Sequence, residues 1–328
     1  MIGNINSLRD VREEKEDNIK IKVVGVGGGG NNAVLHMLHE RVRNVEMYFI
    51  NTEISVFRDT KIRNVIQIGQ TTTRGLGSGA NEIVGERAAL ESKEEIQKAL
   101  YGADMVFVTA GMGGGTGTGA APIVAQLARD MGILTVGIVT KPFLFEGKKR
   151  AMRAETGIKR LYDAVDALIV IKNENLLKAT TEKTSLLDAF KLADDVLKQG
   201  VQSVTDLITT VGEINVDYAD VKTIFENKGK AYMGIGRATG EQRLNEAVKK
   251  AISNPLTENK IDGAKGVIFN VKGGNTLGLI EISNAINQVS DRIDPEANVL
   301  FGTVLDNSLG DMVEVTVIAT GVEEEQSK

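Results

Sequence analysis

Several residue types and patterns are absent from this 328-residue chain, and each absence excludes a class of function. There is no cysteine, so disulfides, thiolate metal sites and cysteine nucleophiles are excluded. No apolar run approaches the roughly 18 residues that a membrane-spanning helix requires. The formal net charge of −5 gives no general attraction to nucleic acid or to an anionic membrane surface, so neither is expected as a direct partner.

Two sequence patterns are also missing: a signal peptide and the phosphate loop of P-loop NTPases. The first 18 residues, MIGNINSLRDVREEKEDN, are polar and charged, so we expect a flexible polar arm, no signal peptide and a cytoplasmic protein. The lysine-containing phosphate loop G-x-x-x-x-G-K-[ST] occurs nowhere, which argues against a P-loop NTPase. Without that loop we interpret Asn259-Lys260-Ile261-Asp262, which matches the base-reading motif of P-loop GTPases, as a turn.

No metal centre is predicted. His36 and His39 lie three residues apart on a predicted helix, and no further metal-ligand motif accompanies them. We therefore interpret both histidines as exposed helix residues.

What the chain does contain is an alternation of apolar strands and helical segments. Helices are predicted over 31–42 and 81–102, and at other points between the strands. This order predicts an α/β fold with a doubly wound parallel sheet and helices on both faces. The predicted strands cover residues 19–26, 45–53, 103–111, 133–142 and 164–173.

A long amphipathic helix follows, with apolar residues at steps of three and four over about 184–208. At 1.5 Å per residue it would be roughly 35 Å long, enough to cross a domain. Beyond it, half-buried strands and two helices predict a smaller α+β domain. The predicted division is an arm (1–18), a first domain (19–183), the central helix (184–208), a second domain (209–322) and a short acidic tail (323–328).

Two glycine-rich loops each follow a predicted strand and open a predicted helix. The first, Gly25–Gly30, contains G-x-G-x-x-G, and Glu53 ends the next strand. Taken alone, this loop indicates a nicotinamide dehydrogenase or a turn without a ligand. The second, GMGGGTGTGAAP (Gly111–Pro122), lies at the same edge of a parallel sheet. Two such helix N-termini would form a polyphosphate cradle, with Thr116 and Thr118 as hydroxyl donors. We expect the glycines to leave room for phosphate oxygens.

The stretch GGGTGTG (Gly113–Gly119) is the signature of the tubulin/FtsZ family, and the chain resembles the FtsZ cell-division GTPases over about residues 19–322. Other matching stretches are KVVGVGGGGNNAV, TRGLGSGAN, VTKPFLFEGKKR and NVDYADVKT. The resemblance implies a GTP-binding domain that a long central helix joins to a smaller α+β domain. It also implies GTP/GDP and Mg²⁺ as ligands, head-to-tail polymerisation into protofilaments, a location at the division site, and other cell-division proteins as partners.

The resemblance implies site residues as well. At the base, local chemistry agrees: Phe190 and Asp194 share one helix face, so a ring can stack on the purine while a carboxylate accepts from N1–H and the 2-amino group. Adenine lacks that donor pair. The alternative for this pair is a core phenylalanine and a solvated aspartate. The implied phosphate contacts are Gly27, Gly28, Gly29, Asn32, Gly113, Gly114, Gly115, Thr116 and Gly117; the ribose and phosphate contacts are Glu146 and Arg150; the guanine contacts are Asn173, Phe190 and Asp194.

Three stretches depart from the family pattern. Asn51-Thr52-Glu53 replaces the usual NTD, Lys172 stands in place of the proline of IPND, and Glu82 stands in place of the proline of GANPE. No phosphate-loop residue is lost, so we expect GTP binding to persist. We expect the lost proline and Lys172 to alter loop rigidity near the base, and nucleotide affinity and turnover to be the properties affected.

NVDYAD (Asn215–Asp220) places two carboxylates, Asp217 and Asp220, after the long helix. Spacing alone indicates caps or solvated charges. Helix rise, however, separates them by roughly 30 Å from the nucleotide end of that helix, so they could reach only a neighbour's nucleotide. The resemblance implies that Asn215, Asp217 and Asp220 enter the next subunit's site and orient the attacking water. The chain would then be a GTP hydrolase whose active site is completed between subunits.

The sequence is compatible with three functions: an assembling GTPase, a non-polymerising nucleotide-binding protein of the same fold, and a dehydrogenase. The combination of motifs favours the first. The family usually carries a linker and a short C-terminal peptide that binds membrane tethers, and neither follows Val322 here. Either the sequence stops short of these segments or the protein reaches the membrane differently, so we expect only indirect membrane contact and no tether binding by this chain.

Overall fold

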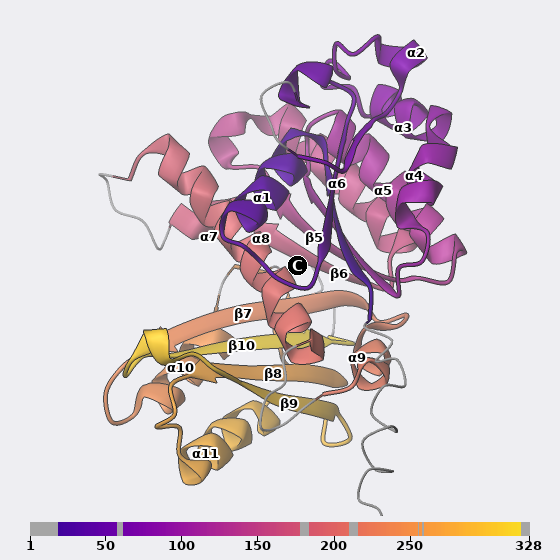
Figure 1. Cartoon of the computed structure of the whole chain (residues 1–328). Coiled ribbons are helices and arrows are strands. Elements are labelled where there is room, and N and C mark those ends of the chain that lie inside the picture. The colour runs from indigo at the N-terminus through magenta and orange to yellow at the C-terminus, as the bar shows by residue number, and fades with distance from the viewer. Residues whose placement is uncertain are drawn as a thin grey trace, which may run out of the picture.

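The computed structural model describes residues 19–57, 62–177, 184–209, 216–254, 256–257 and 259–322. Within these residues one ten-stranded sheet runs through the molecule in the order β3-β2-β1-β4-β5-β6-β7-β10-β8-β9 (Figure 1). The strands are β1 Ile21–Val26, β2 Glu46–Asn51, β3 Val65–Gln67, β4 Met105–Gly111, β5 Leu134–Lys141, β6 Ala167–Lys172, β7 Gly229–Ala238, β8 Gly266–Gly273, β9 Asn298–Leu305 and β10 Val313–Thr320.

The first six strands are all parallel, and helices cover both faces. Apolar residues of α1, α8 and α9 pack on one face, and those of α3, α4, α5 and α6 on the other. The predicted doubly wound parallel sheet is therefore confirmed. The helices are α1 Gly27–His39, α2 Gln70–Thr73, α3 Glu82–Glu91, α4 Lys93–Leu100, α5 Thr116–Asp130, α6 Lys148–Ala164, α7 Asn173–Leu176, α8 Leu186–Thr209, α9 Tyr218–Phe225, α10 Arg243–Ile252 and α11 Leu279–Ser290, with 3₁₀ turns at Ile54–Phe57, Leu144–Glu146 and Asn307–Leu309.

The predicted long helix is α8, whose 24 residues span about 36 Å. It begins near α1 and α7 and runs down to the strands of the second half (Figure 1). Its apolar stripe, which includes Leu197, Val201 and Val204, joins one core cluster with Ile268 and Ile318 of that half. One helix thus packs against both halves of the molecule.

The halves are also joined through the sheet itself. β6 pairs in parallel with β7 over Ala167↔Gly229, Leu168↔Lys230 and Ile169↔Ala231. The sequence interpretation joined the halves by the helix alone and contained no strand over β7. In β8 and β10 nearly every residue is buried, although the alternating pattern suggested half-buried strands. The reason is that α10 and α11 cover one face of this part of the sheet and α8 and α9 cover the other.

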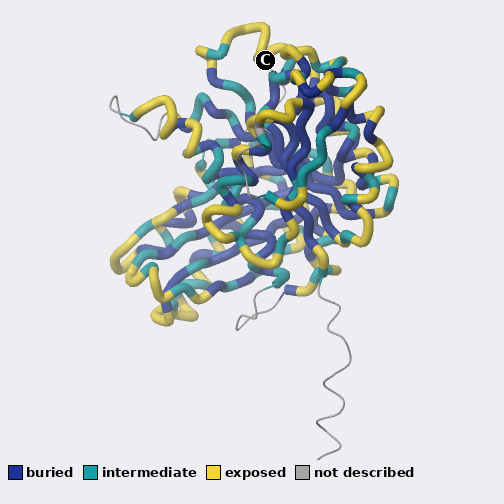
Figure 2. The backbone as a smooth tube through the Cα atoms, turned by 45° about the horizontal axis from the view of Figure 1, so that its top comes forward, coloured by how far each residue is buried: buried dark blue, intermediate teal, exposed yellow. Residues whose placement is uncertain are grey.

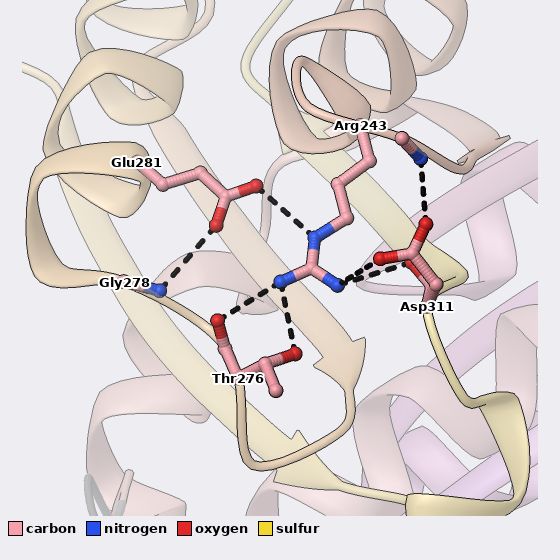
Figure 3. A network of polar contacts seen from close by, with 6 residues as sticks. Arg243, Thr276, Gly278, Glu281 and Asp311 are labelled. Atoms are coloured by element: carbon pink, nitrogen blue, oxygen red, sulfur yellow. Dashed lines mark hydrogen bonds and ion pairs between the residues drawn. The ribbon is translucent and has the colours of Figure 1, made fainter.

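A buried arginine fixes one end of the second half (Figure 3). Arg243 begins α10, and its guanidinium donates to the Thr276 carbonyl at 2.9 Å, to the Asp311 carboxylate at 2.9 Å and to Glu281 at 3.3 Å. Because a buried charge is stable only when paired, this network ties the loop after β8 to the turn before β10.

Two other expectations were wrong in detail. The helix predicted over 81–102 is two helices, α3 and α4, that meet at Ser92, whose hydroxyl accepts from the Gly69 N–H at 3.1 Å. His36 is only partly exposed and lies 2.8 Å from the Asp195 carboxylate of α8, whereas His39 is exposed as expected. Residues 1–18, 323–328 and Asn215 lie outside the described residues. No helix in the described part of the chain is both long and apolar enough to cross a membrane.

Candidate functional site

The candidate site lies where the parallel strands end. Register pairs Gly111 of β4 with Thr140 of β5, and Lys141 of β5 with Lys172 of β6, so the carboxyl ends of these strands share one edge. Both glycine-rich loops, the turn containing Glu146, and Asn173 follow directly after β1, β4, β5 and β6. Ligands of open α/β sheets bind at this edge.

The two glycine loops pack against each other. Gly27 has φ +72°, and a Cβ there would lie 2.6 Å from the Gly117 nitrogen; a Cβ at Gly29 would lie 3.0 Å from the Gly111 Cα. Gly28 and Gly114 differ, since no heavy atom lies within 4 Å of a Cβ placed on either. The expectation that the glycines make room for phosphates was therefore too broad. Most of them permit close backbone packing, and two of them face open space.

The threonine hydroxyls of the second loop are used within the protein. Thr116 Oγ1 lies 2.7 Å from the Thr52 hydroxyl and 3.1 Å from the Ser78 hydroxyl. Thr118 Oγ1 accepts from the Gly113 N–H at 2.8 Å. The groups left to face a phosphate are backbone amides, because the N–H groups in the first turn of α5 have no intrahelical partner.

Glu146 and Arg150 lie beside this loop. Glu146 accepts from the Phe143 N–H at 2.9 Å and pairs with Arg150 at 3.1 Å. A Cβ at Gly113 would lie 2.6 Å from the Arg150 carbonyl oxygen, which shows that α6 begins against the loop. The pair can therefore present a carboxylate and a guanidinium to the sugar and phosphate side of a nucleotide.

Asn173, Phe190 and Asp194 are the residues expected to hold the base, and they lie after β6 and on the first turns of α8. Asn173 is buried, and its Oδ1 has no hydrogen-bond partner. The Phe190 ring is 37% exposed and meets Phe143 edge to face, with centroids 5.5 Å apart. Burial raises the pKa of Asp194 to about 6, against the opposing effect of His36. An unpaired buried acceptor, a half-exposed ring and a desolvated carboxyl fit a base that offers N–H donors.

Asp217 and Asp220 lie at the opposite edge of the sheet. Asp217 caps α9 by accepting from the Asp220 N–H at 2.8 Å, so residues 217–220 start a helix, and the cap agrees with what spacing alone indicated. The intervening Tyr218 donates to the carbonyl of Asp104, the residue before β4, at 2.7 Å. Both carboxylates are exposed, at the amino ends of the strands whose carboxyl ends carry the glycine loops.

Comparison with known proteins identifies the family. The model of the GTPase domain of the tubulin/FtsZ family matches residues 20–181, and the model of the C-terminal domain of the FtsZ family matches residues 229–323. An empty FtsZ dimer from M. jannaschii is 40% identical, with a TM-score of 0.90, over 100% of this chain and 98% of that chain. The chain belongs to the tubulin/FtsZ family.

Other solved structures are consistent with this result. A mutant of M. jannaschii FtsZ is 42% identical, with a TM-score of 0.89, over 97% of this chain and 96% of that chain. CetZ2 from Haloferax volcanii, solved as a protofilament with bound GTPγS, is 20% identical with a TM-score of 0.79 over 94% of this chain and 95% of that chain, and shows the same fold. The dehydrogenase interpretation of the first glycine loop is therefore wrong: residues 20–181 are a GTPase domain that binds guanine nucleotide.

Within this FtsZ-family site, the sequence interpretation missed the residues that hold the loops in place. Thr52 and Ser78 contact Thr116, and Arg153 of α6 contacts Gly113. Asn31 is also buried, and neither of its side-chain polar atoms has a partner, whereas the predicted Asn32 is exposed. Thr52, Ser78 and Asn31 lie in stretches that the sequence comparison had singled out, but their contacts could not be read from those stretches. These contacts depend on which turns meet in three dimensions.

Proposed function

We propose that this FtsZ-family chain polymerises head to tail into protofilaments and hydrolyses GTP at the contact between subunits. One observation carries the proposal: Asp217 and Asp220 lie at the amino edge of the sheet whose carboxyl edge carries the glycine loops. β4 connects the two edges through seven residues, which is roughly 23 Å at 3.3 Å per residue. A chain therefore cannot bring these acids to its own loops.

The same geometry suits a stack of identical subunits. An interface between two different surfaces of one molecule, repeated without closing, produces an open filament. M. jannaschii FtsZ was solved as a dimer, and CetZ2 as a protofilament. In such a stack the exposed acids of one subunit would face the nucleotide of the next.

Exposed apolar side chains at the carboxyl edge support a contact there. Leu144 is 74% exposed, Phe145 60% and Leu187 73%. They lie on the turn that contains Glu146 and at the start of α8. Grouped apolar side chains on a surface mark interaction sites more often than isolated ones do.

The proposed chemistry is the positioning of water. GTP hydrolysis needs an aligned nucleophile and neutralised charge more than covalent catalysis, so Asn215, Asp217 and Asp220 would orient the attacking water. No group of three His, Cys, Asp or Glu residues suited to a metal ion occurs among the described residues. Mg²⁺ fits here as an ion held largely by phosphate oxygens and water, and when bound it neutralises phosphate charge.

The proposed function divides among the three parts of the chain and places the filament in the cell. We assign nucleotide binding to the first domain (19–183), the connection between the domains to the central helix (184–208), and the acids to the second domain (209–322). The filament would form the cytoplasmic division ring, with other division proteins as partners and only indirect membrane contact.

Turnover measured against protein concentration tests the proposal, with light scattering recorded on the same samples. The rate of GTP hydrolysis per subunit should be near zero below a threshold and should rise with scattering. A rate per subunit that is unchanged by dilution would show that each chain hydrolyses alone.

Asp217→Asn tests the proposed role of the acids in GTP hydrolysis. Asparagine is as good an N-cap as aspartate, so α9 keeps its cap while the charge is removed. We expect unchanged GTP binding and a fall in turnover of about 100-fold or more, the range of a lost positioned acid or base. Glu226→Gln, at the other end of α9, is the matched control and should hydrolyse normally. Weak GTP binding by Asp217→Asn, with a normal rate per bound nucleotide, would contradict the assignment.

A further inference from the structure

The guanidinium of Arg153 bridges two loops of the nucleotide site. From α6, its Nε donates to the Gly113 carbonyl at 3.0 Å, and a terminal nitrogen donates to the Ala80 carbonyl at 2.7 Å. Gly113 belongs to the phosphate loop, and Ala80 to the preceding loop 74–81. One side chain thus joins the two loops.

Both carbonyls belong to residues in left-handed backbone conformations. Gly113 has φ +97°, and Ala80, which has a Cβ, has φ +59°. A residue such as Ala80 stays in this conformation only when its surroundings hold it there. Loop 74–81 has positive φ at Arg74 and at three glycines as well, so its shape depends on contacts such as this one.

The Gly113 contact sets the direction of the next amide. In a trans peptide the C=O of one residue and the N–H of the next point in opposite directions in one plane. Since the Gly113 C=O points at Arg153, the Gly114 N–H points away from α6. The other side of Gly113 is also fixed, because its own N–H donates to Thr118.

Gly114 is the place in the second loop where a ligand can approach. It is half-buried, whereas Gly113 and the residues from Gly115 to Gly119 are buried. In the molecule as a whole, buried backbone fills the centre and exposed backbone lies mostly in the outer turns and helices (Figure 2). No heavy atom lies within 4 Å of a Cβ placed on Gly114. It also precedes the first turn of α5 by two residues, where the helix dipole favours an anion.

We propose that Arg153 is a positioning residue that holds the Gly113–Gly114 peptide with its N–H turned toward the nucleotide phosphates. This role of Arg153 rests on the proposed function in one respect only, which is that the nucleotide phosphates lie at the second glycine loop. Without the guanidinium, the peptide between two glycines is free to rotate, and one amide donor to the phosphates is lost. Hydrogen bonds to charged groups are the strong ones, so the loss weakens binding of phosphate-bearing ligands in particular.

Arg153→Met removes the donors and keeps an apolar stem. Nucleotide-free protein would be titrated calorimetrically with GDP and with guanosine, below the concentration at which it assembles. We expect GDP to bind about tenfold more weakly and guanosine to bind as in wild type, because only the phosphate contact is altered. The GDP affinity of Arg153→Lys should lie between those of wild type and Arg153→Met, since an ammonium cannot reproduce the two-armed geometry of a guanidinium.

Arg160→Met is the matched control. Arg160 lies two turns along α6 and pairs with Glu86 at 2.8 Å, away from the loops, so both affinities should be unchanged. Unchanged GDP affinity in Arg153→Met would overturn the inference, and so would equal losses for GDP and guanosine, which would indicate a general effect on the fold. A wild-type chain that bound neither ligand would overturn the proposed function, and this inference with it.

Discussion

At the scale of single residues, the environment of Asp194 determines how the base would be held. Burial raises the pKa of this carboxyl to about 6, while His36, which itself contacts Asp195, favours the charged form. Guanine offers two N–H donors to a carboxylate. A protonated carboxyl presents a donor instead, so only the ionised form matches the base.

Guanine-nucleotide affinity should therefore depend on pH. Above pH 6 the carboxylate is present and binding is strongest; as the pH falls through about 6 the acid protonates, and affinity at pH 5 should be about tenfold lower. Asp194→Asn should bind weakly and show no such loss, and comparing the two chains cancels the titration of the phosphates. His36→Gln separates the effect of the histidine on the pKa of Asp194 from the effect of burial. Equal pH dependence in wild type and Asp194→Asn would show that Asp194 does not contact the base.

At the scale of helices and strands, glycines decide how closely the helices behind the phosphate loop approach. A Cβ at Gly119 of α5 would lie 2.0 Å from the Glu82 carbonyl oxygen of α3, and one at Gly85 of α3 would lie 2.3 Å from the Gly115 carbonyl oxygen. The two helices therefore touch backbone to backbone, and α5 carries the amides of the phosphate loop at its start.

Gly119→Ala should push α3 away from α5. Overpacking of this kind costs about 1–3 kcal/mol, and we expect an equivalent loss in the free energy of denaturant unfolding together with weaker GDP binding. Arg87→Ala, at an exposed position on α3, is the control and should change neither the free energy of unfolding nor the GDP affinity. A stable Gly119→Ala chain with normal GDP affinity would show that the contact between α3 and α5 does not determine the conformation of the phosphate loop.

Periodicity was sufficient to predict most elements of the first half, because buried parallel strands form continuous apolar runs and amphipathic helices have a clear stripe. It failed for β7, where three glycines interrupt the pattern of GKAYMGIGRA. It also failed at the helix starts: α1 and α5 begin inside the glycine runs, because those residues are needed for close packing and not as loops.

The site residues divide in the same way. Phe190 and Asp194 could be paired from their spacing on one helix. Ser78 and Ala80 lie in loop 74–81 and Arg153 lies on α6, and only the fold brings these two segments to the phosphate loop. Contacts between turns far apart in the sequence leave no periodic signal, which is why the residues that support the site could not be predicted.

At the scale of the whole molecule, the continuous sheet and α8 separate the edge that carries the glycine loops from the edge that carries Asp217 and Asp220. The sheet passes from the first half to the second at β6–β7, and α8 packs against both (Figure 1). The glycine loops and the acids consequently lie at opposite edges of the sheet. In the proposed filament, the acids of one subunit would meet a nucleotide only at the contact with a neighbour.

Mixing two inactive variants would test this separation directly. Asp194→Ala loses the base contact and keeps the acids, whereas Asp217→Asn keeps the nucleotide site and loses an acid. Each alone should hydrolyse little GTP. In an equal mixture about a quarter of head-to-tail junctions join an intact nucleotide site to an intact acid pair, so turnover should recover to about a quarter of wild type. Asp217→Asn mixed with the double variant carrying both changes has no such junction and should stay inactive. If the first mixture also stayed inactive while it assembled, the acids would have to act within their own chain, and the separation of roughly 23 Å across the sheet would have to close in solution.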